Sequence, residues 1–510
     1  MKERIANISK RTWVRIALVS ILVTIVTFGY LGEKIPVHDG IGWDGMNYFG
    51  SMQEFVYNIA HHGYNQYDIR RALPWGITNI IYTILGKEVT VDTAIISGII
   101  YNVIALFLSV FFFFRISNLK KWKLETEVLG FAFLFYTYPI LKFMGYYPVL
   151  SDIFGLTVGI IMCYYFFADK KWALIACGFL GAFIWPTTPV VAFALAFFPR
   201  KALPLAKKED MKIEKIVLYL FFIAIASIPM VMALMKQIRY PGFFTSRSQG
   251  LYFPLTLPIS EWEVVLTCLC SCLFYYYIAS AFKVSLFDTL KENFIGKEVW
   301  KNYACFLLCL VITTFGSKML ANTDPGALTM KSAFYVISFT SFTDPFVFIE
   351  SHFMFFGLGY LLVLVFWKDI AKIILQQGIG YLFVVAIWAL FSIRPEARVS
   401  IMYVVFPVMA LLMYLDTKDI RPYAVSLATV FSLALSRFWF PFNAPGMEKE
   451  MIIGDNISNF LEFPAQRYFM SSGHWQSHDM YYLFMTITII VGVIIYAGIK
   501  NKWFVKKVYN

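Results

Sequence analysis

Long apolar segments separated by short charged ones constrain the fold of this chain more than any other feature. The first runs from Trp13 to Leu31, follows a stretch that contains Lys2, Arg4, Lys10 and Arg11, and has Arg15 near its start. About 20 consecutive apolar residues are enough to cross a lipid bilayer as an α-helix. Basic residues before the first such segment keep the N-terminus in the cytoplasm. The sequence therefore predicts an all-α integral membrane protein whose chain starts on the cytoplasmic side.

Similar segments recur along the chain and predict about twelve transmembrane helices in a single polytopic domain, residues 1–510. They are expected at residues 13–31, 91–114, 128–141, 153–168, 216–235, 263–282, 303–317, 352–367, 376–392, 400–415, 423–436 and 480–499. An even number of crossings returns the C-terminus to the cytoplasm, where several lysines precede the chain end. Residues 172–198 are apolar too, but basic residues flank them and Trp185-Pro186-Thr187 breaks them, which predicts a re-entrant helical hairpin.

Composition and charge fit a membrane protein. The chain is 59% hydrophobic and only 15% charged, with a mean hydropathy of +0.65. A net charge of +12 would suggest a nucleic-acid partner for a soluble protein. Here most of the Lys and Arg fall in the expected cytoplasmic segments, so no nucleic-acid partner is expected. The seven cysteines lie in apolar segments, where we expect them to pack as small apolar residues.

The first loop expected on the outer side, residues 32–90, carries the residues best suited to chemistry. Its two carboxylates, Asp39 and Asp44, belong to the glycine-rich turn His38-Asp39-Gly40-Ile41-Gly42-Trp43-Asp44-Gly45. Either carboxylate is a candidate base or metal ligand, and the glycines allow the backbone to approach a substrate. Arg70 and Arg71, near the far end of the loop, are candidates for binding phosphate oxygens. Apolar stripes at residues 49–59 and 73–84 predict two helices along the membrane interface.

Three motifs in roughly the first 200 residues have counterparts in a known family. They are Trp43-Asp44-Gly45-Met46-Asn47-Tyr48, Tyr67-Asp68-Ile69-Arg70-Arg71-Ala72-Leu73-Pro74 and Tyr147-Pro148-Val149-Leu150-Ser151-Asp152. They resemble the acidic first loop, its arginine-rich exit and a serine-acidic pair in the GT-C superfamily of polytopic membrane glycosyltransferases. At Trp185-Pro186-Thr187-Thr188 the chain departs from the threonine-acidic pair that such relatives often have.

The resemblance implies a GT-C-like fold in which residues 1–200 form the catalytic module and residues 201–510 add further helices. It implies a polyprenyl-phosphate-linked sugar donor, a glycan or lipid acceptor of the cell envelope, and an inverting transfer outside a bacterial cytoplasmic membrane. Asp44 becomes the candidate base with Asp39 as its neighbour, and Asp152 joins the candidate substrate-binding residues. Some relatives use a divalent cation and others do not, so the need for a metal is open.

Other charged residues on the expected outer side extend this set. Arg394 and Arg398 lie in the short turn 393–399 and are further candidates for the donor phosphate, although pairing with Glu396 is an alternative. The outer loop at residues 236–262 carries basic and aromatic residues suited to the entrance for a sugar or lipid. A histidine pair, His474 and His478, has the spacing of metal ligands on a helix but is interpreted as a surface feature.

Several candidates also have ordinary structural explanations. Asp44 precedes a predicted helix from residue 46 and is suited to be its N-cap. Ser151 and Asp152 are typical of a helix start, and the arginine pair of the first loop is suited to bind lipid headgroups.

Two other functions remain open at this point. A transporter or flippase for a lipid-linked saccharide would use the same charges to line a path and break no bond. A polysaccharide polymerase or ligase that uses an undecaprenyl-diphosphate glycan would depend on the arginines more than on Asp44. A transporter needs ionisable residues within its spans, whereas here they gather at the outer ends. We therefore expect a glycosyltransferase whose loops 32–90, 236–262 and 393–399 form one outer cavity around Asp44.

Overall fold

The computed structural model describes residues 2–205, 261–324, 345–442 and 478–505, with a few isolated positions between them. Its N-terminal part contains α1 (Lys2–Leu31), η1 (Val37–Gly40), α2 (Trp43–Ala60), η2 (Ile69–Arg71), α3 (Ala72–Ile84), α4 (Val91–Lys120), α5 (Leu124–Phe135), η3 (Pro139–Phe143), α6 (Met144–Tyr146), α7 (Asp152–Phe167), α8 (Lys171–Gly181) and α9 (Thr188–Phe197). Within the described residues the chain forms no β-strand beyond two isolated bridges.

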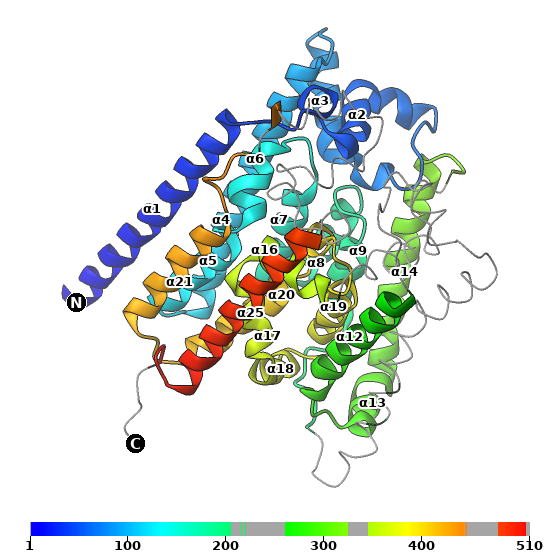
Figure 1. Ribbon diagram of the computed structural model, residues 1–510. Helices are drawn as coiled ribbons and strands as arrows, with labels where there is room; N and C mark the ends of the chain where they lie inside the picture. Colours follow the sequence, from blue (N-terminus) through cyan, green and yellow to red (C-terminus); the bar gives the residue numbers. More distant parts are fainter. Residues whose placement is uncertain are drawn as a thin grey trace.

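The C-terminal part is helical as well. It contains α12 (Glu261–Ser280), α13 (Leu286–Phe294), α14 (Lys297–Leu320), α16 (Val347–Phe356), α17 (Leu358–Val365), α18 (Trp367–Gln376), α19 (Ile379–Phe391), η4 (Ala397–Ser400), α20 (Val405–Asp416), α21 (Pro422–Leu435) and α25 (His478–Lys500). Several long helices, among them α1, α4, α21 and α25, run in a similar direction, and α2 and α3 cover one end of the bundle (Figure 1). We call this end the α2–α3 end.

Within the described ranges, four helical segments are long and apolar enough to cross a membrane. They are Lys10–Leu31, Val91–Lys120, Lys297–Leu320 and Tyr481–Lys500. A fifth crossing results if α5 and Pro139–Tyr146, which meet at 51°, form one bent span. Most other predicted spans coincide with shorter apolar helices, and residues 216–235 lie outside the described part. The all-helical prediction is confirmed, together with several helices of membrane length, while the number of crossings stays a prediction.

Two breaks explain why some apolar segments do not form single helices. Pro139 follows α5 and has no backbone N–H to continue the helical hydrogen bonds, so the chain bends there. Gly357 separates α16 from α17 with a φ of 72°, a conformation that favours glycine. The predicted span at residues 352–367 is therefore broken in the described structure.

The predicted hairpin at residues 172–198 consists of α8 and α9, which pack against each other. Gly178 allows this contact, because a Cβ there would lie 2.2 Å from the ring of Phe193. The turn between the helices includes Pro186, at the break seen in the sequence. Whether the hairpin enters a membrane from the cytoplasm stays a prediction.

Helix α20 is the centre of the bundle. It packs against α5, α7, α17, α18 and α19, and residues 405–412 are all buried. A helix that is apolar on all sides is stable only inside a core or a membrane. Because η4 lies four residues before α20, this central helix fixes the position of the short turn that carries Arg398.

Helix α1 lies at the edge of the bundle and is attached at both ends. Near its start, Arg11 and Arg15 pair with the fully buried carboxylate of Glu127, with 2.7 Å between Arg15 Nη2 and Glu127 Oε2. Near its end, Gly29 lies so close to Gly145 that a Cβ on Gly145 would be 2.7 Å from the Gly29 carbonyl carbon. Two distant contacts therefore hold a helix whose sides are otherwise largely exposed.

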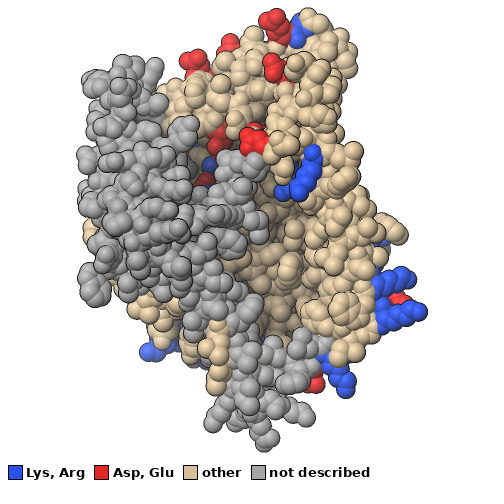
Figure 2. Space-filling model, turned by 90° about the vertical axis from the view of Figure 1, so that its right-hand side faces the viewer, with Lys and Arg blue, Asp and Glu red and all other residues tan. Residues whose placement is uncertain are grey.

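Charged side chains are distributed unequally on the face of the molecule drawn in Figure 2. On the face drawn in Figure 2, Asp and Glu gather mainly towards the α2–α3 end, and most Lys and Arg lie towards the opposite end. The start of α1 and the end of α25 also lie on the side away from α2 and α3 (Figure 1).

Candidate functional site

Three segments far apart in the sequence meet at the α2–α3 end: the start of α2, the start of α7 and the turn η4. They contribute Asp44, Asp152 and Arg398, respectively. An Arg398 Nη2 to Asp44 Oδ2 distance of 2.7 Å shows a direct ion pair. The outer loops predicted at residues 32–90 and 393–399 therefore meet, as expected, whereas most of the loop at 236–262 lies outside the described residues.

Arg398 lies among three carboxylates. Besides Asp44, its guanidinium approaches Glu396 Oε1 at 2.7 Å through Nε, and Asp152 Oδ2 at 3.9 Å through Nη1. Burial by itself would lower the pKa of Arg398, but the three surrounding carboxylates raise this pKa well above its usual range. The guanidinium is therefore a fixed positive charge. We call Asp44, Asp152, Arg394, Glu396 and Arg398 the Arg398 cluster.

Arg394 completes the cluster by pairing with Glu396 from the other side. The alternative expected from the sequence, pairing of both arginines with Glu396, is thus present in the structure. This pairing does not exclude a role of the two arginines in binding a substrate. Arg398 also contacts Asp44, and Arg394 Nε is buried without a hydrogen-bond partner among the described residues. A buried donor without a partner is costly and is a candidate for binding an anionic group.

Asp44 is not the N-cap of α2, so this structural explanation is wrong. The helix begins at Trp43, one residue before Asp44, and the N-cap position is Gly42, which makes no capping side-chain bond. The carboxylate instead points to Arg398, and 38% of the Asp44 side chain remains exposed. Asp44 is therefore the member of the cluster that a reactant from outside reaches most easily.

Glycines in the Asp44 turn make room for a tyrosine of the protein itself. Gly42 has a φ of 77°, and a Cβ there would lie 2.2 Å from Cζ of Tyr147. The backbone N–H of Gly45 donates to the Tyr147 hydroxyl at 3.1 Å. The sequence suggested that these glycines admit a substrate, but in the structure they admit the Tyr147 ring beneath Asp44.

Arg71 lies in an aromatic environment close to the Arg398 cluster. Its guanidinium donates to the Tyr48 hydroxyl at 3.1 Å and lies 4.4 Å from the ring centre of Tyr67 and 5.4 Å from that of Trp185. The Tyr48 hydroxyl also forms a 2.9 Å hydrogen bond with the hydroxyl of Ser151, next to Asp152. Arg71 is thereby connected to the start of α7. Its predicted role in binding phosphate fits this location.

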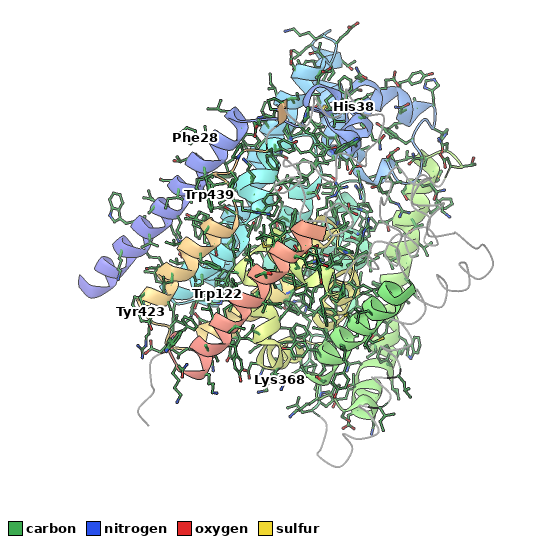
Figure 3. All side chains as sticks on the ribbon, viewed as in Figure 1. Phe28, His38, Trp122, Lys368, Tyr423 and Trp439 are labelled. Carbon is green, nitrogen blue, oxygen red and sulfur yellow. The ribbon has the colours of Figure 1, made fainter. Side chains whose placement is uncertain are left out.

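Arg70 and Asp39 are not brought into the cluster. Arg70 is half-buried and forms no ion pair with a described residue. Asp39 is exposed, and its φ of 53° follows a φ of 47° at His38, so two successive left-handed residues turn its side chain away. Figure 3 places His38 at the α2–α3 end. Asp39 therefore shares this surface with Asp44 but not its ion pair.

Ser151 and Asp152 lie at the start of α7, as expected if they serve as a helix start, and both also form contacts with other segments. Ser151 is the N-cap residue and makes no capping bond with its side chain, and its hydroxyl instead bonds with that of Tyr48. Asp152 is buried and faces Arg398. A cavity of about 20 Å³, lined in part by Asp152 and Tyr147, is large enough for a single water molecule.

A buried histidine that was not predicted as a site residue forms a hydrogen bond with η4. His352 of α16 is fully buried, and its Nδ1 lies 2.7 Å from the Phe348 carbonyl oxygen. This distance requires Nδ1 to carry the proton, so the Ser400 hydroxyl donates to Nε2, which lies 3.0 Å away. The bond attaches the last residue of η4 to α16. No local pattern predicts it, since His352 lies in an apolar segment.

The described residues contain no group of three or more His, Cys, Asp or Glu side chains placed to hold a metal ion. The carboxylates at the site surround a guanidinium instead. His474 and the side chain of His478 lie outside the described part, as do Lys236 and Arg239, two basic residues of the loop predicted at 236–262. The cysteines whose side chains are described are free thiols and are buried or half-buried.

Comparisons with models of protein families, with curated proteins and with solved structures find no match to this chain.

Proposed function

We propose that this protein is an integral membrane glycosyltransferase of the GT-C type that transfers a sugar from a polyprenyl-phosphate donor to a glycan or lipid acceptor. The observation that carries the proposal is the 2.7 Å ion pair between Asp44 and Arg398. It places a candidate base next to a candidate phosphate ligand, on a partly exposed surface at one end of a bundle of apolar helices.

In the proposed reaction, the acceptor hydroxyl attacks the anomeric carbon of the donor sugar. The bond between this carbon and the phosphate oxygen breaks, and polyprenyl phosphate leaves with the bonding electrons. Attack opposite the leaving group inverts the configuration. Arg398 exchanges Asp44 for the donor phosphate, and the released carboxylate then accepts the hydroxyl proton. The exchange is reasonable because Arg398 keeps Glu396 as its second partner.

The position of Arg398 favours it as the main phosphate ligand. The turn that carries it is fixed by the buried helix α20 and by the bond between Ser400 and His352. A side chain that is already held in place loses less conformational freedom when it binds an anion. Arg71 and Arg394 are the proposed additional phosphate ligands, because each is largely buried near the cluster.

We further propose that the α2–α3 end faces the outside of a bacterial cytoplasmic membrane and that both termini lie in the cytoplasm. The uneven distribution of charge supports this orientation, since Lys and Arg gather towards the opposite end (Figure 2) and basic residues favour the cytoplasmic side. In this arrangement about twelve segments cross the membrane, α8 and α9 form a re-entrant hairpin, and α2 and α3 lie along the outer interface.

The test is transfer of radiolabelled sugar by the purified full-length protein in detergent. Polyprenyl-phosphate hexoses and pentoses serve as donors, and an extract of envelope glycans and lipids serves as acceptor. Asp44→Asn keeps the size of the side chain but removes the base, and we expect about a 10²- to 10⁴-fold loss of turnover. The matched control is Asp39→Asn, which removes an exposed carboxylate of the same turn and should retain activity.

Each outcome decides between named alternatives. Full activity of Asp44→Asn would contradict the role of this residue, and loss of activity in Asp39→Asn alone would move the base to Asp39. If no donor is cleaved but labelled lipid crosses the membrane of proteoliposomes, the transporter alternative is correct. Cleavage of undecaprenyl-diphosphate glycans alone would support the polymerase or ligase alternative.

A further inference from the structure

An apolar groove of about 900 Å³ lies between α21 and α25. Helix α21 packs on α5 and α17, and α25 packs on α16 and α17. The space between α21 and α25 is lined by side chains such as Leu129, Leu427 and Ile494. Its volume is at the upper end of the range of about 300–1,000 Å³ that is typical of ligand sites. The groove is therefore large enough for an extended apolar molecule.

Two lysines, Lys418 and Lys502, are the charged residues that line this groove. Lys418 follows α20 by two residues, and Lys502 follows α25 by two. An antiparallel bridge between Ile420 and Val505 holds these two segments side by side, and the Arg421 N–H donates to the Phe504 carbonyl oxygen at 3.0 Å. Both lysines are thus fixed at the same end of the groove, away from the α2–α3 end (Figure 1).

Positive charge at this end is not cancelled by the acidic residue that terminates α20. Asp416 accepts a hydrogen bond of 2.8 Å from the backbone N–H of Lys123 and does not line the groove. Lys123 places its ammonium group near the same segment, where it donates to the carbonyl oxygen of Lys418 at 2.8 Å. The groove therefore combines apolar walls with a cationic end.

We propose that this groove binds one anionic phospholipid, with an acyl chain between α21 and α25 and the headgroup phosphate at Lys418 and Lys502. Apolar walls match the hydrocarbon chain, and lysines near the cytoplasmic membrane surface attract anionic headgroups. The proposal rests on the membrane location given above but not on the glycosyltransferase activity. Its failure and the failure of the transfer assay are therefore independent.

The experiment measures lipid binding to the full-length protein by native mass spectrometry. Detergent-purified protein is titrated with phosphatidylglycerol and with phosphatidylcholine of the same acyl chains. We expect tighter, saturable binding of one phosphatidylglycerol, and about a 10- to 30-fold weaker affinity for the double variant Lys418→Gln/Lys502→Gln. The matched control is Lys368→Gln/Lys372→Gln, which removes two lysines of α18 that do not line the groove. Its affinity should stay within about twofold of the unaltered protein. Figure 3 places Lys368 at the end of the molecule opposite His38.

A second variant tests the apolar part of the site. Ala428→Phe adds a ring to the wall of the groove and should reduce the binding of both lipids. Equal affinity of the unaltered protein for the two lipids would overturn the proposal. An unchanged affinity in the Lys418→Gln/Lys502→Gln protein, or an equal loss in the control, would overturn it as well. These lysine variants decide the question even if Ala428→Phe does not fold.

Discussion

Replacing Arg398 by methionine keeps a long side chain but removes the cation that three carboxylates share. The Asp44 pair contributes little to the expected loss, about 0–1 kcal/mol, because 38% of the Asp44 side chain is exposed. Glu396 keeps Arg394 as a partner. Asp152 is the main cost, since only 11% of its side chain is exposed and it loses the cation that lowers its pKa most, which leaves Arg71. Loss of one partner from a buried pair costs about 3–5 kcal/mol, so we expect a total in this range.

A melting curve in detergent measures this loss. With about 2.1 cal/mol/K of unfolding entropy per residue, a chain of 510 residues has about 1.1 kcal/mol/K in total. A loss of about 3–5 kcal/mol then lowers the melting temperature by about 3–5 °C. Arg70→Met is the matched control, because Arg70 is half-buried and forms no ion pair with a described residue. All variants are heated at the same scan rate, since such unfolding is often irreversible.

A double variant separates the electrostatic cost from lost packing. Burial raises the pKa of Asp152 to about 6, and loss of Arg398 makes its charged form still less favourable. Asp152→Asn removes this titratable group, so the pair of substitutions should be more stable than Arg398→Met alone at pH 7. The explanation is refuted if Arg398→Met melts at the same temperature as Arg70→Met. It is refuted also if adding Asp152→Asn gives no recovery.

Three further predictions concern single residues. Gly42→Ala should lower the free energy of unfolding by about 2 kcal/mol or more, because Gly42 has a positive φ and an added Cβ would clash with a tyrosine ring. Gly50 has open space around it, so Gly50→Ala should be neutral or stabilising in the same melting assay. Burial raises the pKa of Asp68, so the charged form of this residue destabilises the folded protein at pH values above the pKa of the unfolded state. Asp68→Asn should therefore melt at a higher temperature than the unaltered protein at pH 7, and the difference should vanish towards about pH 4. A difference that stays constant with pH would contradict this prediction. Glu127→Gln should lose about 3 kcal/mol because two arginines of α1 lose their carboxylate, and Glu125→Gln, which forms no described ion pair, should melt normally.

The local part of the fold was predictable because apolar length and helix-breaking residues are local properties. Helix α20, expected at residues 400–415, spans Val405–Asp416, and the break at Pro186 separates α8 from α9 as the sequence indicated. The break at Gly357 was missed because the residues around it are uniformly apolar. A single glycine in an apolar segment is compatible with a continuous helix, so only the packed structure determines its conformation.

The candidate site was predictable as a set of residues but not as a set of contacts. Asp44 and Arg398 were both selected, yet no local pattern indicates that residues so far apart in the sequence form an ion pair. Asp39 was selected as the neighbour of Asp44 because the two are close in sequence. Left-handed backbone at His38 and Asp39 instead exposes Asp39 to solvent, and this conformation is not encoded by the residue types alone.

The attachment of α1 to Glu127 joins residues that are made at different times during synthesis. Arg11 and Arg15 leave the ribosome more than a hundred residues before their carboxylate does, so Glu127 cannot yet pair with these two cations when α1 is made. In the membrane location proposed above, lipid headgroups would bind these cations until α5 is made. Once Glu127 has been made, the same two arginines can bind α5, so this contact of α1 forms only after more than a hundred further residues.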